Sequence, residues 1–148
     1  MHPFDLNAAL FAKHAQHVVL IHFPIALFVI GVAFDYVGQL NGKAALKFAA
    51  YYNFLVAAVS AVPATISGLL AWQWQLDGRR LHGILLLHLI LGVTSALLLL
   101  TVAWIHLSAH QVAHSPPRYR LAIELAGVIV VGITGHLGGF LSGVNASG

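Results

Sequence analysis

The 148-residue sequence has no cysteine, and its one methionine is the first residue. Without cysteine the chain can form no disulfide, no iron–sulfur cluster and no thiolate metal site. The shortage of sulfur also argues against passage of copper(I), which favours thiolate and thioether ligands. Charged residues make up only 7% of the chain, where roughly a quarter is usual in soluble domains. The few charges lie near the ends of apolar segments, which argues against a nucleic-acid partner.

Apolar residues, by contrast, make up 59% of the sequence. They gather in four long segments, and a helix that crosses a bilayer needs about 20 such residues. Because lipid offers no partners for backbone N–H and C=O groups, each segment must form a helix, and short loops favour up-and-down packing. We therefore predict an all-α integral membrane protein, an up-down four-helix bundle in a lipid bilayer. Its predicted parts are an interfacial segment at 1–16 and a single transmembrane domain at 17–148, with helices at about 17–37, 48–72, 81–105 and 121–141.

An even number of helices places both ends of the chain on one side of the membrane, which we name side A; the opposite side is side B. Lysine and arginine are more frequent in cytoplasmic loops than in exported ones. Side B has more of them than side A, so this split favours side B as cytoplasmic and the termini as periplasmic. The residues at side B are Lys43, Lys47, Arg118 and Arg120, and those at side A are Lys13, Arg79 and Arg80.

Histidine occurs ten times, and the alternating helix directions bring several of these residues to side A. At a rise of about 1.5 Å per residue, His22, His88 and His136 lie at similar depths, roughly 8–10 Å inside the helices. Each is flanked by small residues at spacings of three and four, which is typical of helix–helix contacts in membranes. We therefore expect these three to face the bundle interior. His17 and His82 lie nearer the water boundary and, at about 100° per residue, point elsewhere.

These imidazoles predict a cofactor or metal site. Neutral imidazole is a good ligand for iron, copper and zinc, and two histidines on facing helices can hold the iron of a b-type haem. His22 and His88 are the predicted axial pair. His136 is the alternate ligand, or it contacts the cofactor or a quinone. The additional pair, His17 and His82, could serve a second haem, so the prediction is haem b, with one or two copies.

Three further residues fit a haem at side A. Gly68 belongs to a stripe of small residues on the second helix, and a flat ligand could lie against it. Arg79 and Arg80 lie at the interface, where guanidinium groups could pair with haem propionates. Anchoring of the loop among lipid headgroups is an equal alternative for these two arginines.

Three functions are compatible with these residues. The first hypothesis is a haem b electron-transfer subunit that relays electrons between quinone or a membrane redox complex and a carrier at side A. The second is a copper or zinc binding or transport protein in which His22, His88 and His136 form the site. The third is an accessory subunit of a larger membrane complex, whose histidines only form hydrogen bonds. The sequence shows no nucleophile–base pair and no phosphate-binding loop, which favours a subunit of an oxidoreductase complex over an enzyme acting alone.

Side B has a histidine pattern of its own. His106, His110 and His114 recur at every fourth residue beyond the third apolar run. Such a stripe could bind a metal or an anionic lipid, but the following Pro116 and Pro117 favour a solvated helix end. We find no partner ligand on another helix for a haem at side B.

Two acidic residues, Asp35 and Glu124, also lie near side B. Carboxylates at membrane depth are costly unless they are paired. We expect these two to pair with Lys43 or Arg118 and assign them no catalytic role.

Four segments carry a family resemblance: HVVLIHFPIALF, ATISGLLAW, RRLHGILLLH and ITGHLGGFLSGV. Together they resemble, from His17 to Val144, the bacterial four-helix membrane proteins catalogued as domain of unknown function 2231. The resemblance implies a small protein of the bacterial inner membrane. It also implies a link to cytochrome c-like modules, which are sometimes found beside or fused to members of this family, and this agrees with electron transfer. It implies no established catalytic residues.

Overall fold

The computed structural model describes residues 15–75, 78, 80–111 and 116–142. Within these ranges all four helices are long and apolar enough to cross a membrane. The prediction of an all-α, four-helix membrane protein is confirmed. The predicted interfacial segment lies outside the described residues except for its last two, which already belong to the first helix. The helices are α2 (Ala15–Leu40), α3 (Ala44–Gln75), α4 (Gly83–Gln111) and α5 (Arg120–Leu141).

Most helix ends extend beyond the predicted apolar segments. The α4 helix, for example, continues to Gln111 through polar residues that the hydropathy pattern assigns to a loop. Hydropathy marks the part of a helix in lipid, whereas the backbone hydrogen bonds continue into the headgroup region. At its other end α4 begins at Gly83, later than predicted, because the φ of +56° at this glycine is left-handed and breaks the helical path.

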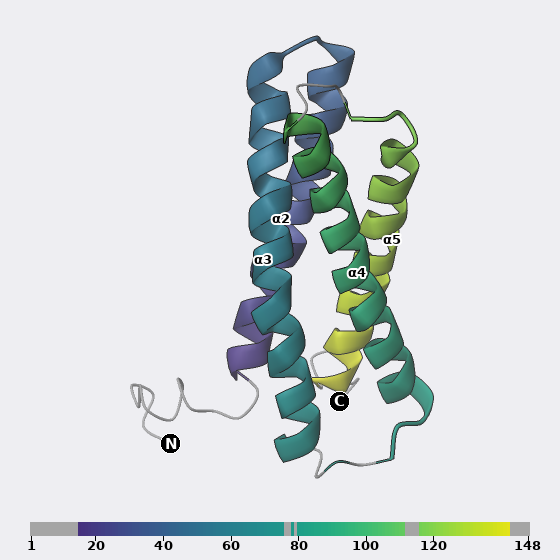
Figure 1. Ribbon diagram of the computed structural model, residues 1–148. Helices are drawn as coiled ribbons and strands as arrows, with labels where there is room; N and C mark the ends of the chain where they lie inside the picture. The colour runs from purple at the N-terminus through teal and green to yellow at the C-terminus, as the bar shows by residue number, and fades with distance from the viewer. Residues whose placement is uncertain (1–14, 76–77, 79, 112–115, 143–148) are drawn as a thin grey trace.

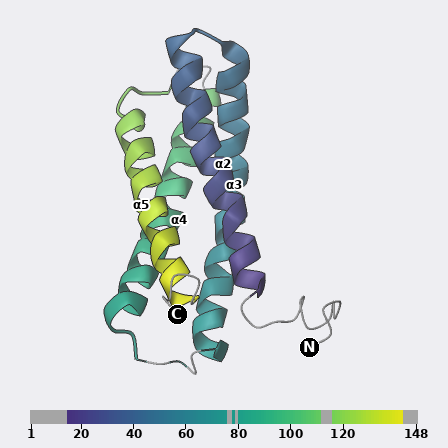
Figure 2. The same ribbon diagram turned by 180° about the vertical axis from the view of Figure 1, so that it is seen from behind.

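The helices run alternately up and down (Figure 1), and the start of α2 lies at the same end as the end of α5. This lower end is side A, and Figure 2 shows the same arrangement from behind. The α2 helix packs along α3, α3 along α4, and α4 along α5, with a smaller contact that closes the ring between α2 and α5. The helices α2 and α4 therefore lie on a diagonal of the bundle.

The apolar core occupies the middle of the bundle and its side B half. Phe28 and Phe54 are fully buried, with ring centroids 5.7 Å apart. Glycines on the facing helices admit these rings: a Cβ on Gly127 would lie 2.7 Å from the ring of Phe28, and one on Gly31 would lie 2.9 Å from that of Phe54. The other buried members of this core are Ala50, Ala57, Ala61, Leu99, Val102 and Val131.

The side A half is packed differently. Beyond Phe28, Ala64, Leu99 and Val131, no described residue other than Pro24 adds a buried apolar side chain. The interior toward side A is therefore lined by partly buried and small residues, and this is where two of the predicted histidines lie.

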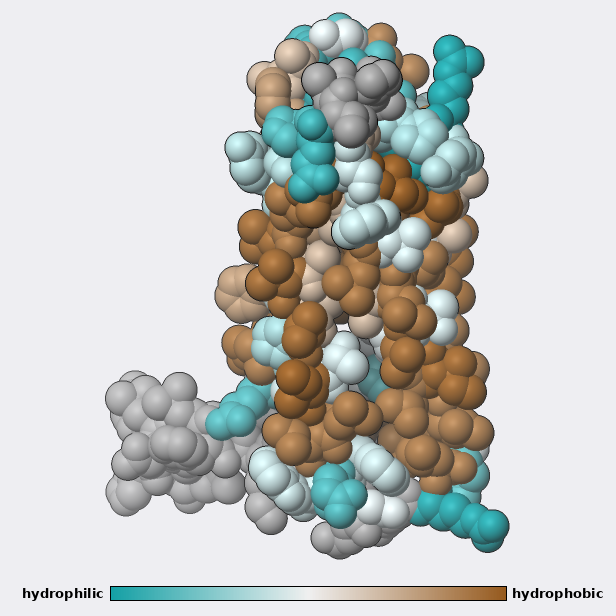
Figure 3. Space-filling view, viewed as in Figure 1, coloured by the Kyte–Doolittle hydropathy of each residue, from teal (hydrophilic) through white to brown (hydrophobic). Residues whose placement is uncertain are grey.

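The outer surface is apolar over most of the height of the bundle. Figure 3 shows a broad hydrophobic band between polar ends. Many large apolar side chains are more than half exposed, among them Val19, Phe23, Val59, Leu97 and Trp104. An apolar surface of this extent suits lipid and not water.

Candidate functional site

Two of the five histidines predicted as site residues, His17 on α2 and His88 on α4, are partly buried in the bundle. Both continue the inward faces of their helices: His17 lies seven residues before buried Pro24, and His88 lies eleven residues before buried Leu99. Seven residues make nearly two full turns and eleven make about three, so each histidine repeats the facing of a core residue. The two imidazoles lie close enough to interact electrostatically.

The hydrogen bonds of these histidines fix which ring nitrogen carries the proton. Nδ1 of His88 lies 3.1 Å from the carbonyl oxygen of Thr134, which can only accept, so Nδ1 is the donor. Nδ1 of His17 lies 2.9 Å from Oγ of Ser67. That hydroxyl donates its own hydrogen to the carbonyl of Ala64 at 2.8 Å, so His17 donates to it. Each neutral ring therefore presents the lone pair of its Nε2, as a metal-binding histidine does.

Two glycines make room for the rings. A Cβ on Gly68 would lie 3.0 Å from Cε1 of His17, and a Cβ on Gly138 would lie 3.2 Å from Cε1 of His88. The flat group that rests against Gly68 is thus the imidazole of His17. These contacts hold each ring against a neighbouring helix, α3 for His17 and α5 for His88.

The predicted inward facing of His22 and His136 is wrong, because both are exposed. Nδ1 of His22 bonds the carbonyl of Val18 one turn back on its own helix. The ring of His136 packs edge-on against Phe140 at 5.0 Å. In α2 the small residues did not mark the face that contacts other helices, since Ala26 is exposed.

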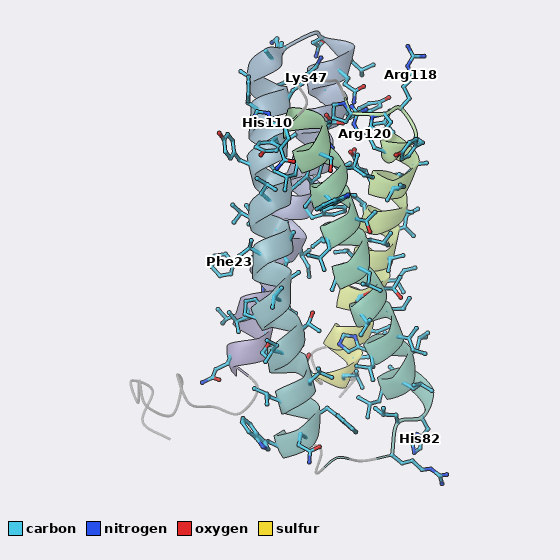
Figure 4. The ribbon with its side chains drawn as sticks, viewed as in Figure 1. Phe23, Lys47, His82, His110, Arg118 and Arg120 are labelled. Atoms are coloured by element: carbon cyan, nitrogen blue, oxygen red, sulfur yellow. The ribbon has the colours of Figure 1, made fainter. Side chains whose placement is uncertain are left out.

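Two other residues predicted at side A, His82 and Arg80, do not join this pair. His82 is exposed in the segment before α4, and Arg80 is exposed beside it. Figure 4 shows His82 at the lower end, away from the bundle interior. Arg79 lies outside the described residues, so the proposed role of both arginines at haem propionates stays a prediction.

A second polar group, missed from the sequence, is buried near side B. It consists of Asp35, His106, Arg120 and Glu124, of which none is more than 4% exposed. We name these four residues the side B cluster. They come from α2, α4 and α5, and each continues the buried face of its helix: Asp35, for example, follows Phe28 by seven residues.

Short contacts join all four members of the side B cluster. Arg120 Nη2 lies 2.9 Å from Oδ2 of Asp35, and its Nε lies 3.6 Å from Oε1 of Glu124. Nε2 of His106 lies 2.9 Å from the same Oε1. Gln39 donates to Asp35 at 2.8 Å. The second oxygen of Glu124, Oε2, is buried and has no hydrogen-bond partner among the described residues.

These contacts correct the expected pairing of the two acids. Asp35 pairs with Arg120 and not with Lys43 or Arg118, and Glu124 pairs with His106 and Arg120. The solvated helix end predicted for the histidine stripe is also wrong for His106, which is buried, although it holds for exposed His110. His114 lies outside the described residues.

A cleft of about 370 Å³ opens beside the side B cluster. Asp35, His106 and Arg120 line it, whereas Glu124 does not. Figure 4 shows Lys47, His110, Arg118 and Arg120 gathered at this end. The ring of His110 stacks on Tyr51 at 4.6 Å at the edge of the cleft.

Asp35, His106 and Glu124 could each offer one ligand atom to a metal, since these atoms lie within 4.8 Å of one another. The guanidinium of Arg120, however, lies against both carboxylates. A metal ion held by these ligands would lie next to this cation and be repelled by it, so the cluster favours an ion-pair network over a metal site.

Comparison with known proteins assigns the sequence to a family. No curated protein and no solved structure matches the chain. The family model described as "Predicted membrane protein (DUF2231)" matches residues 13–146. This match confirms the resemblance seen in the sequence, and the chain belongs to this family of predicted membrane proteins.

Proposed function

We propose that the protein is a membrane-embedded haem b electron-transfer subunit in which His17 and His88 would hold the haem iron. One observation carries this proposal: both imidazoles are partly buried and donate through Nδ1 to protein oxygens, so each ring has its lone pair on Nε2. Haem, when bound, supplies reversible one-electron transfer at its iron. The ligand pair differs from the predicted one only in that His17 replaces His22.

The surroundings of the pair support a haem. The two ligands come from α2 and α4, which lie on a diagonal, so they approach the bundle axis from opposite sides. The half of the bundle around them has no large buried side chain among the described residues, and a lining of partly buried and small residues suits an apolar macrocycle. Ser67 and the Thr134 carbonyl fix the ring orientations, as outer partners of iron-binding histidines do.

The second hypothesis, a copper or zinc site of three imidazoles, is less well supported. Its members His22 and His136 are exposed to the surroundings of the bundle. Two inward histidines match the two axial positions of a haem, whereas zinc in proteins takes three or four protein ligands.

The electron route completes the proposal. A site near side A suits exchange with a carrier of cytochrome c type at that side, and quinone or a membrane redox complex would be the other partner. We place the protein in the bacterial inner membrane with the termini periplasmic. Arg120 is buried in the side B cluster and so no longer counts among the loop cations. The numbers of lysine and arginine at the two sides therefore do not support this orientation, which rests on the proposed carrier.

The test is a dithionite-reduced minus oxidised absorption spectrum of the purified protein, with metal analysis of the same sample. We expect a b-type band with stoichiometric iron in the wild type. The His17→Ala and His88→Ala variants should lose the band completely. His22→Ala is the matched control on the same helix and should keep it.

Each other result decides against the proposal. Loss of the band in His22→Ala but not in His17→Ala would restore the pair predicted from the sequence. Copper or zinc in place of iron would favour the second hypothesis. A folded protein with neither band nor metal, after expression with added haem precursor, would leave the histidines with a structural role in an accessory subunit.

A further inference from the structure

The side B cluster has an unbalanced charge. Two carboxylates and one guanidinium leave a net charge of −1 when His106 is neutral. All four residues are almost fully buried within helices that span the membrane. An uncompensated charge in such surroundings costs several kcal/mol, so the cluster becomes electroneutral by binding one proton.

The hydrogen bond between His106 and Glu124 is the place for that proton. Nε2 and Oε1 lie 2.9 Å apart, so one proton can lie on either side, as imidazolium with carboxylate or as imidazole with carboxylic acid. Oε2 of Glu124 is an independent sign of a proton-binding site, because it is a buried carboxyl oxygen with no hydrogen-bond partner among the described residues. Asp35, by contrast, already receives donors from Arg120 and Gln39.

Charges on the other side of the cleft do not balance the cluster. On α3, Lys47 is exposed, and so is Arg118 ahead of α5, so water screens both. Tyr51 and His110 stack on each other at the cleft.

We propose that Asp35, His106, Arg120 and Glu124 form a proton-binding site that exchanges one proton with water at side B through the cleft. In the binding step a hydronium ion in the cleft transfers its proton to the His106–Glu124 pair. One O–H bond of hydronium breaks, one N–H or O–H bond forms in the pair, and a water molecule remains. The cleft touches three members of the cluster, and Glu124 behind them is the inner end of the path. This site does not depend on the proposed haem, since it lies about 27 Å along α4 from His88 at 1.5 Å per residue.

Infrared spectroscopy of the full-length protein in lipid nanodiscs tests whether the side B cluster binds a proton. The whole chain has only four acidic residues, so its carboxylic acid C=O region is simple. In His106→Gln the proton can no longer lie on imidazole, and we expect one carboxylic acid band at neutral pH. The band should disappear at alkaline pH and shift on transfer to D₂O.

Second substitutions identify the source of that band. Adding Glu124→Gln or Asp35→Asn to His106→Gln makes the cluster neutral without a proton, so the band should vanish in both double variants. Adding Asp5→Asn or Asp77→Asn should leave it unchanged. A folded His106→Gln protein with no titrating band would overturn the proposal, and a band that D₂O does not shift would overturn exchange with water.

A wild-type measurement covers the case in which His106→Gln does not fold. Between neutral and alkaline pH, wild type should release one proton more than Glu124→Gln, measured with a pH indicator at matched protein concentration. Equal proton release by the two proteins would mean that the cluster is a static ion-pair network.

Discussion

The two ends of the bundle use histidine in different ways. At side B, the ring of His106 is bonded to a carboxylate and packs on Phe54 at 4.6 Å, next to a closed apolar core. At side A, His17 and His88 bond neutral oxygens through Nδ1 and lie where the described residues form no such core. His106 therefore satisfies a charged neighbour, whereas the Nδ1 bonds of His17 and His88 leave the lone pair of each ring on Nε2. Changes at the two ends should therefore have different consequences.

The largest effect on stability is expected from Arg120→Ala. This change leaves two buried carboxylates without their cation and frees the carbonyls of Pro116 and Pro117, to which Nη1 donates. Removing one partner of a buried ion pair typically costs about 3–5 kcal/mol. The measurement is unfolding by SDS in mixed micelles. The matched control is Arg118→Ala, an exposed neighbour, which should change the unfolding free energy by less than about 1 kcal/mol. Equal losses in the two variants would mean that the side B cluster does not stabilise the fold.

A smaller loss is expected from Gly127→Leu, at the centre of the bundle between the two ends. A Cβ at this position would lie 2.7 Å from the ring of Phe28, and Phe28 is fully buried. Overpacking of this kind typically costs about 1–3 kcal/mol. Gly132→Leu on the same helix is the control, because a Cβ there meets nothing within 4 Å. If the two variants unfold alike, the close contact of α2 with α5 is not a determinant of the packing.

The fold and the inward facing of His88 were predictable from the sequence, for a physical reason. Four apolar runs can only be helices in lipid, and this constraint acts within each segment. Which side of each helix faces the bundle interior is harder to predict, because membrane helices expose apolar residues to lipid as readily as they bury them. His22 was assigned to the interior through its alanines, yet the contact face of α2 carries Phe28 and Gly31.

The side B cluster shows where sequence reasoning stops. The step of seven from Phe28 to Asp35, and the spacing of four between Arg120 and Glu124, could have placed these residues on inward faces. Their partners, however, come from three helices. The choice of Arg120 over Lys43 or Arg118 depends on how α2 and α5 meet, which no local pattern records.

The smallest effect on stability, and the sharpest separation of the two ends, is expected from Ser67→Ala. Ser67 accepts from His17 and donates to the Ala64 carbonyl. Loss of a single hydrogen bond of this kind typically costs about 0.5–1.5 kcal/mol. If His17 is an iron ligand, its ring also loses the group that fixes its orientation, and haem affinity should fall about 10- to 100-fold, the usual effect of removing an outer partner of a metal ligand.

The matched control for this change is Ser60→Ala. Ser60 lies on the same helix and donates to the carbonyl three residues back, that of Ala57, at 3.1 Å, but no hydrogen bond joins it to an imidazole among the described residues. Both variants lose the same helical bond, so any difference in haem titration between them reports the His17 contact alone. Equal haem affinities of the two variants would mean that Ser67 does not contribute to haem binding. A fall confined to Ser67→Ala would connect the hydrogen bond that fixes Nδ1 to the ligand at Nε2.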